Sequence, residues 1–211
     1  PELSAQLDAA LASKGLLQSS FDNIHELLGS SDNSVYEAAV SELANDGQWA
    51  ELNNRFFKKL AFGTGGLRGR SIGEIVTSAE RGSAGSDERP EHPCVGTANL
   101  NFYNVTKATL GLVNQLKKSH NGEDRPSIAI ARDTRFFGRE FINCAAKVAN
   151  ENGVDIYLFP VPRSTPHLSF AVRHLGTAAG IVLTASHNPP HDNGFKAYGR
   201  DGAQLVDPDA S

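Results

Sequence analysis

Apolar residues recur along this chain with two different periods. In the first sixty residues they fall at helical spacing. Two runs carry this pattern: Leu3, Leu7, Ala10 and Leu11, then Val35, Ala38, Ala39 and Leu43. Ser34 followed by Glu37 three residues later predicts a capping box at the start of the second helix. We therefore expect a helical N-terminal extension over residues 1–55.

From residue 104 onward, short apolar strands alternate with amphipathic helices. Helices are predicted over residues 104–116, 141–152 and 165–174, and strands over residues 127–131, 154–159 and 178–183. Strands that are apolar throughout and separated by helices are typical of a parallel sheet covered on both faces. The fold class expected is α/β, with a three-layer α/β/α domain over residues 56–211 whose mixed sheet is mostly parallel. The polar segment 81–93 is expected to be a long loop.

The loop after the last predicted strand gathers polar and rigid residues. It reads LTASHNPPHDNGFKAYG from Leu183 to Gly199. Two prolines fix the backbone directly after the Ser186–Asn188 stretch. Asn193-Gly194 predicts a turn, after which residues 195–198 return as a strand carrying Lys196 towards the serine. Ligands in open α/β sheets bind beyond the carboxyl ends of strands, where this loop begins.

The serine admits several interpretations. The loop can be an ordinary surface turn with incidental hydroxyls. A serine hydrolase is disfavoured, because the G-x-S-x-G pattern is absent and His187, adjacent on an extended loop, should point away from Ser186. A phosphoryl carrier fits better, since Lys196, His187 and Arg68 can supply protons or cations. Arg68 stands in a segment with glycines at 63, 65, 66 and 69, although such a cluster alone indicates a tight turn as readily.

Composition narrows the class of protein. The 211 residues carry a net charge of -4 with a pI of about 6.0, which argues against nucleic-acid or anionic-membrane binding. No apolar run is long enough for a membrane span and no signal peptide is evident. Cys94 and Cys144 are expected to be free thiols of a cytoplasmic protein. The chain has no methionine and stops at a polar stretch, residues 207–211, so we expect it to be part of a longer protein.

Four segments together resemble a known family. FGTGGLRG (62–69), ARDTRFFGREF (131–141), RSTPHLSFAVRHLG (163–176) and GIVLTASHNPPHDNGFKAYG (180–199) occur in this order. They resemble the first domain of the α-D-phosphohexomutases, the phosphoglucomutase/phosphomannomutase superfamily, over about residues 61–205. The T-A-S-H-N-P motif is similar to the phosphoserine signature of that family.

The resemblance implies a reaction and a set of roles. A phosphorylated Ser186 would exchange its phosphoryl group with hexose 1- and 6-phosphates through a 1,6-bisphosphate, with Mg²⁺ bound to the serine phosphate and glucose 1,6-bisphosphate as activator. Arg68 would orient the reacting hydroxyl and His187 would contact the phosphoryl group. Lys196 would be the general acid/base, which requires a lowered pKa. Asp133 and Arg135 would tie the sheet to its loops.

The resemblance also implies parts that this sequence lacks. Complete family members have four domains, and the later three bring a D-G-D-x-D-R metal loop, a sugar-reading loop and a phosphate clamp. None of these motifs occurs here. We therefore expect the N-terminal phosphoserine-bearing domain of a cytoplasmic mutase, inactive by itself, whose partners are a phosphosugar and the remaining domains of the same polypeptide. A phosphopentomutase, or a non-catalytic phosphosugar-binding or regulatory module, remains the alternative.

Overall fold

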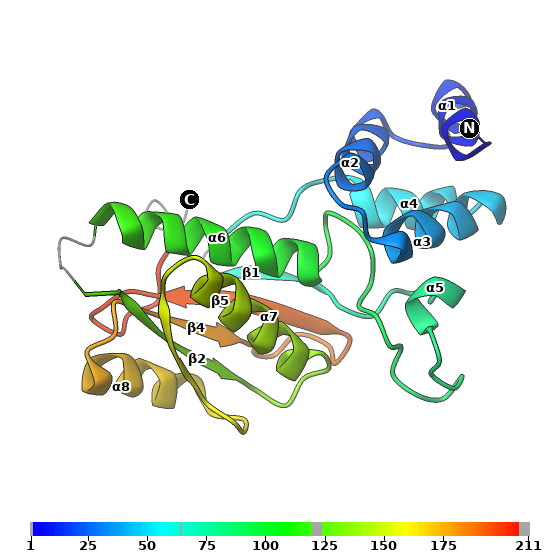
Figure 1. Cartoon of the computed structure of the whole chain (residues 1–211). Helices are drawn as coiled ribbons and strands as arrows, with labels where there is room; N and C mark the ends of the chain where they lie inside the picture. The colour runs from blue at the N-terminus through cyan, green and yellow to red at the C-terminus, as the bar shows by residue number, and fades with distance from the viewer. Residues whose placement is uncertain (1, 64, 120–123, 207–211) are drawn as a thin grey trace. The chain divides into compact units, whose positions relative to one another are not determined.

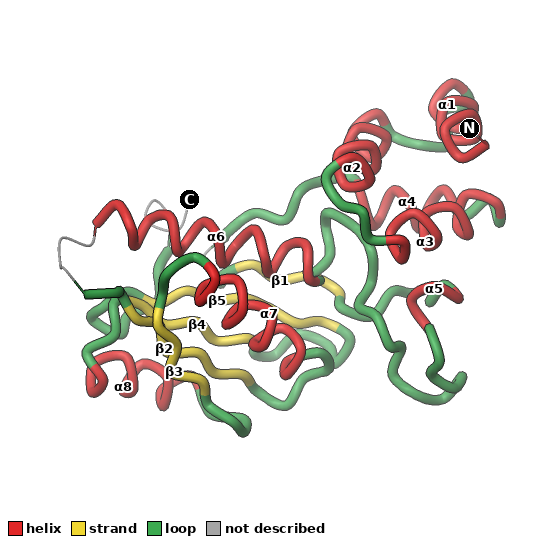
Figure 2. Tube along the Cα trace, in the orientation of Figure 1, coloured by secondary structure: helices red, strands yellow, loops and turns green. Residues whose placement is uncertain are grey.

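A computed structural model describes residues 2–63, 65–119 and 124–206, and the predicted polar end at 207–211 lies outside them. The elements follow in the order α1 (Glu2–Ala12), α2 (Gln18–Gly29), α3 (Ser34–Asn45), α4 (Trp49–Phe56), β1 (Leu67–Arg70), α5 (Ser78–Arg81), α6 (Phe102–Ser119), β2 (Ser127–Arg132), α7 (Gly138–Glu151), β3 (Asp155–Leu158), α8 (Thr165–Leu175), β4 (Ala179–Leu183) and β5 (Asp192–Tyr198). Figure 2 colours them by type. Among the described residues, no helix has both the length and the apolar character that crossing a membrane requires.

The chain divides into two compact units. One comprises residues 1–60 and 70–101, and the other residues 61–69 and 102–211. The chain therefore enters the second unit at the glycine-rich segment, leaves it, and returns with α6. The two units do not correspond to the predicted domains 1–55 and 56–211, because residues 70–101 belong to the same unit as the N-terminal helices. The boundary at residue 56 refers to domains of the family and stays a prediction.

The second unit is built on a mixed sheet with strand order β1-β5-β4-β2-β3 (Figure 1). Strands β3 and β4 both pair with β2 in parallel, and β5 runs antiparallel to β4. The prediction of a mostly parallel mixed sheet is confirmed. Because β2, β3 and β4 are parallel, their carboxyl ends lie at one edge of the sheet.

Helices cover both faces of this sheet. Leu168 and Val172 of α8 pack on Ala129, Ala131, Val182 and Tyr198, which form one buried cluster. Side chains alternate along a strand, so Ile128 and Ile130 of β2 face the other side, where α7 packs on β2 and β3 and beside α6. The three-layer α/β/α prediction is confirmed (Figure 1).

Asn193 and Gly194 do not form the predicted turn but stand inside β5. Asn193 is fully buried and donates its Nδ2 to the carbonyl of Phe136 at 2.9 Å. A Cβ on Gly194 would lie 2.3 Å from the carbonyl oxygen of Thr184 and 3.0 Å from that of Leu67. The glycine is thus required by close approach of neighbouring backbones rather than by a turn.

The first unit contains the predicted helices, with one correction. Asn33, not Ser34, caps α3, since its side chain accepts a hydrogen bond from the amide of Val35 at 3.0 Å. A capping box does occur elsewhere, at Thr77 and Glu80 of α5. The cap lies one residue earlier than predicted because α3 begins at Ser34. The N-cap is the residue before the first helical residue, and that residue is Asn33.

A buried arginine organises the loops of the first unit. Arg55, 2% exposed, pairs with Glu51 at 2.7 Å and with Glu80 at 2.6 Å. Its guanidinium also donates to the carbonyls of Ile75 and Val95. Helix α4 is thereby joined to α5 and to the segments on either side of it. A buried cation needs such partners, because desolvation without them costs several kcal/mol.

Both cysteines are free in the structure, as expected. Cys94 is buried in the first unit and Cys144 is half-buried on α7. Burial raises the pKa of the Cys94 thiol and that of the Cys144 thiol. Both groups therefore stay protonated near neutral pH, where thiols react slowly.

Candidate active site

Ser186 lies on the loop that follows the carboxyl end of β4. Thr184 and Ala185 are buried, and the chain becomes exposed at Ser186. The predicted placement of this loop after a parallel strand is confirmed. Asp133 follows β2 at the same edge, and its amide donates to the carbonyl of Leu183 at 3.0 Å. Two strand ends therefore converge at the serine.

The backbone of Ser186 is in the left-handed region, with φ of 56°. This conformation costs a residue with a Cβ roughly 1–2 kcal/mol. The amide of Ser186 donates to Oγ1 of Thr184 at 3.0 Å, and the amide of Asn188 donates to the carbonyl of Ala185 at 3.0 Å. These bonds close a tight turn around the serine. The hydroxyl is therefore exposed on a backbone that is held in place.

His187 lies closer to the serine than the sequence predicted. Its Nδ1 is 3.4 Å from Ser186 Oγ. The expectation that the two side chains point apart was wrong, because it assumed an extended loop, and the left-handed turn at Ser186 brings them to one side. His187 is exposed and can exchange a proton or a hydrogen bond with a group on Ser186 Oγ.

Arg68 reaches this loop from β1, a strand that the sequence did not predict. Its Nη1 donates to Oδ1 of Asn188 at 3.2 Å and its Nε donates to the carbonyl of Gly65 at 3.2 Å. Gly66 has φ of 87°, and a Cβ there would lie 2.5 Å from the carbonyl oxygen of Phe195. The glycines thus let this segment approach β5 closely. They also direct Arg68 to the loop between β4 and β5, residues 184–191, called the serine loop below.

Lys196 lies on β5, in register with Val182 of β4, one pair before the carboxyl end of that strand. Partial burial, followed by the positive charge of Arg68, lowers the pKa of Lys196 below its ordinary value. A lowered pKa is what the general acid/base role expected for Lys196 requires. In the part of the chain that the structure describes, neither Arg68 nor Lys196 hydrogen-bonds directly to Ser186.

We expect Arg68→Gln to raise the pKa of Lys196. The substitution removes the cation that disfavours the protonated lysine, while the burial remains, so the pKa should move only part of the way back to its ordinary value. The measurement is an NMR titration of protein labelled in its lysine side chains. Arg139→Gln, an exposed position on α7, is the matched control and should leave the titration unchanged. An unchanged or lower Lys196 pKa in Arg68→Gln would contradict the assigned proximity.

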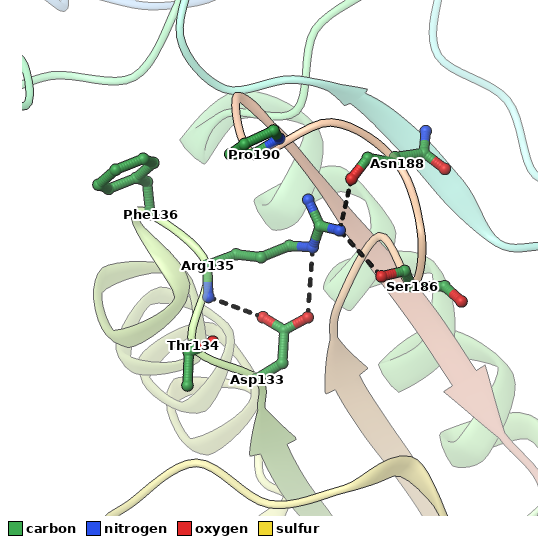
Figure 3. Close-up of a pocket in the computed structure, with 7 residues that line it drawn as sticks. All are labelled: Asp133, Thr134, Arg135, Phe136, Ser186, Asn188 and Pro190. Carbon is green, nitrogen blue, oxygen red and sulfur yellow. Dashed lines mark hydrogen bonds and ion pairs between the residues drawn. The ribbon is translucent and has the colours of Figure 1, made fainter.

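A pocket of about 350 Å³ lies on the Arg135 side of the serine loop, lined by Asp133, Thr134, Arg135, Phe136, Ser186, Asn188 and Pro190 (Figure 3). Arg135 donates hydrogen bonds to carbonyls of the loop and pairs with Asp133. The interpretation that these two residues tie the sheet to its loops agrees with these contacts.

Sequence reasoning gave no role to Asn188 and Asp192, which join the site residues. Asn188 accepts from Arg68 and donates its Nδ2 to Oδ2 of Asp192 at 3.0 Å. Oδ1 of Asp192 in turn lies 3.5 Å from Nε2 of His191. In the sequence, the only indication of the Asn188–Asp192 contact is that these two short polar side chains stand four residues apart, on either side of Pro189-Pro190. This indication is weak.

The described residues do not by themselves form a metal site. Within residues 2–63, 65–119 and 124–206, no three His, Cys, Asp or Glu side chains come together as a metal would require. The nearby carboxylates are already engaged, Asp133 with Arg135 and Asp192 with Asn188. They therefore do not fit a Mg²⁺ ion without further ligands.

Comparison with known proteins gives a consistent result. Residues 91–211 match the family model described as phosphoglucomutase/phosphomannomutase, alpha/beta/alpha domain I. The chain is 42% identical over 150 residues to a phosphoglucomutase of Staphylococcus haemolyticus, a match that covers 71% of this chain and 23% of that protein. It is 40% identical over 155 residues to a phosphoglucomutase of Staphylococcus aureus, covering 74% and 24%. The chain thus spans about a quarter of the length of these relatives.

Solved structures agree in fold. A putative phosphomannomutase from Thermus thermophilus superposes with a TM-score of 0.55 at 27% identity, over 72% of this chain and 28% of that one. The open form of a Paramecium phosphoglucomutase, parafusin, gives a TM-score of 0.51 at 23% identity, over 72% and 25%.

Proposed function

Since this chain belongs to the phosphoglucomutase/phosphomannomutase family, we propose that it is the phosphoserine-bearing part of an enzyme that interconverts hexose 1-phosphate and hexose 6-phosphate. The observation that carries the proposal is Ser186, an exposed hydroxyl on a constrained left-handed turn beyond the end of β4. Arg68 and Lys196, whose pKa is lowered, stand on the neighbouring strands β1 and β5. A fixed hydroxyl near cations suits phosphoryl transfer, which depends on positioning and charge neutralisation.

In the proposed reaction Ser186 Oγ carries the phosphoryl group. When a sugar hydroxyl attacks the phosphorus, the bond from phosphorus to Ser186 Oγ breaks and a sugar bisphosphate forms. The departing Oγ takes up a proton from His187, whose Nδ1 lies 3.4 Å away, and the serine hydroxyl returns that proton to His187 when it attacks in the return step. Lys196 in its neutral form accepts the proton of the attacking hydroxyl, for which its lowered pKa prepares it. In the return step the other phosphate of the bisphosphate is transferred to Ser186, and the protonated lysine returns its proton to the departing sugar oxygen.

Arg68 and His187 assist in different places. The Arg68 guanidinium, held by Asn188 Oδ1, supplies a fixed positive charge beside the serine loop. His187 Nδ1, close to Ser186 Oγ, contacts the transferred phosphoryl group. A Mg²⁺ ion on the serine phosphate would neutralise part of its charge, and its main ligands are proposed to come from a second domain, since the residues described here do not form a metal site.

The proposed enzyme is a longer polypeptide than this chain. The relatives are about four times as long as the part matched here. We propose that their additional length supplies the metal ligands and the sugar contacts, so that residues 1–211 alone do not catalyse the mutase reaction. A cytoplasmic location is proposed on the free state of Cys94 and Cys144.

The test begins with the complete polypeptide that contains this chain. Incubation with glucose 1,6-bisphosphate should place a phosphate on Ser186, located by mass spectrometry of peptides. A coupled assay with Mg²⁺ should then show glucose 1-phosphate converted to glucose 6-phosphate, with residues 1–211 alone inactive. A phosphate found elsewhere would refute the role of Ser186. Turnover of pentose phosphates in preference to hexose phosphates would refute the hexose assignment, and absence of any turnover would refute the enzyme.

A further inference from the structure

Arg135 donates four hydrogen bonds to backbone carbonyls of the serine loop and the first residue of β5. Its Nη2 donates to the carbonyl of Ser186 at 2.9 Å and to that of Asn188 at 2.7 Å. Its Nη1 donates to the carbonyls of Pro189 at 2.7 Å and Asp192 at 3.0 Å. One side chain thus contacts the loop at both ends and in its middle, from the serine to the start of β5.

The guanidinium is itself fixed from behind. Oδ1 of Asp133 accepts the backbone amide of Arg135 at 2.9 Å, and Oδ2 lies 3.4 Å from its Nε (Figure 3). The Arg135 side chain is 13% exposed. Every nitrogen of the guanidinium is therefore engaged with the loop or with Asp133, which leaves no strong donor for an added ligand.

The pairing decides what Arg135 can contribute. Its positive charge is balanced by Asp133, so the pair adds little net field at the phosphoryl group. Figure 3 shows the Ser186 carbonyl turned to the guanidinium and its hydroxyl directed away. Arg135 therefore acts on the backbone of Ser186 rather than on the reacting atoms.

We propose that Arg135 is a positioning residue for phosphoryl transfer: by binding the carbonyls of residues 186, 188, 189 and 192, it holds Ser186 in the left-handed conformation that presents Oγ. The proposal rests on the proposed function of Ser186 as the phosphoryl carrier. The conformation needs such support, because φ of 56° is unfavourable for serine and a free loop would relax towards negative φ. The carbonyl of Pro189 has one further donor, the amide of Asp192 at 3.0 Å.

The shape of the side chain is part of the proposal. A planar guanidinium offers five donors in fixed directions, and four carbonyls with one carboxylate use them all. A lysine ammonium has three donors at a single atom and cannot span the same carbonyls. Lysine should therefore keep the ion pair with Asp133 and lose most of the positioning.

The experiment compares Arg135→Ala and Arg135→Lys with Arg139→Ala in the complete enzyme. Arg139 is exposed on α7, four residues along the chain, and serves as the matched control. For Arg135→Ala we expect kcat to fall by about 10²-fold, the effect of a misplacement near 1 Å, with little change in KM. Arg135→Lys should fall between this variant and the wild type. The rate at which glucose 1,6-bisphosphate phosphorylates Ser186 should fall in parallel.

Chemical rescue separates positioning from a merely structural role. Guanidinium ions, added below the concentration that unfolds the protein, should raise kcat of Arg135→Ala and leave Arg139→Ala unchanged, because the added ion can bind the vacated carbonyls. If Arg135→Ala does not fold, Arg135→Lys decides: a folded lysine variant with wild-type kcat overturns the proposal. Arg135→Ala with the kcat of the control also overturns it, as does a slow, folded Arg135→Ala that guanidinium does not accelerate.

The wild type distinguishes this inference from the function on which it rests. If the wild-type enzyme acquires no phosphate on Ser186, the proposed function fails. If it is phosphorylated and Arg135→Ala is phosphorylated equally fast, the function stands and the role of Arg135 fails.

Discussion

Replacing Ser186 with alanine is expected to lower kcat of the complete enzyme by about 10⁴-fold or more, since loss of a covalent nucleophile removes the reaction path itself. Thr184, the neighbouring hydroxyl in the described loop, cannot take its place, because it is buried and accepts the amide of Ser186. The fold should be unaffected, as the side chain is exposed. The measurements are a coupled mutase assay and the intact mass after incubation with glucose 1,6-bisphosphate.

Ser86→Ala is the control for this substitution, because Ser86 is an exposed serine of the other compact unit. It should keep wild-type turnover and still gain one phosphate. Ser186→Ala with kcat within tenfold of this control would show that the phosphoryl carrier lies elsewhere.

Arg55→Met should destabilise the first compact unit by about 3–5 kcal/mol, the cost of leaving buried carboxylates without their cation. Glu51 and Glu80 are both nearly buried, and both lose their ion pair in the variant. Methionine fills most of the space of the arginine side chain, so the creation of a cavity contributes little to the loss of stability. Urea unfolding of the chain, followed by the fluorescence of Trp49 on α4, reports on this unit because Trp49 is its only tryptophan.

Lys58→Met is the matched control, since Lys58 is exposed two residues after α4. Its unfolding midpoint should stay near that of the wild type. The double variant Arg55→Met with Glu80→Gln should lose less stability than the sum of its two single variants. In the double variant, the glutamine at position 80 leaves no buried carboxylate at that position without its cation. Additive losses would mean that the two side chains do not interact.

The strands of the sheet were predictable because each central strand is a continuous apolar run between polar ends. Predicted strands at 127–131 and 178–183 agree with β2 and β4 to within a residue. Strand β1, LRGR, has no such run and was missed, because its pairing depends on β5, which is distant in sequence. Period-based reasoning fails where the partner strand, rather than the local pattern, stabilises the element.

The sequence pointed to Ser186, His187, Arg68 and Lys196, and this set of site residues stays a prediction. It revealed neither their geometry nor the contacts of Asn188 and Asp192. The motif identified Ser186, and the sheet topology put it at a strand end. The left-handed backbone, and with it the approach of His187, follows from hydrogen bonds to Thr184 and Arg135 that no local pattern reveals. The Asn193-Gly194 dipeptide was predicted to form a turn because its tertiary contacts, too, cannot be read from the local sequence. The dipeptide is common in turns, but here burial of the asparagine and close backbone contact at the glycine determine the structure.

The backbone angle of Ser186 also restricts which alcohol can stand at this position. Threonine offers the same nucleophilic oxygen, but a β-branched side chain is a genuine outlier at positive φ, because its second γ atom meets the flanking peptide groups. At φ of 56° the additional methyl would force the turn open or displace the hydroxyl. Glycine would adopt the angle without strain and would offer no oxygen. Among the amino acids with an aliphatic hydroxyl, the turn therefore accommodates serine alone.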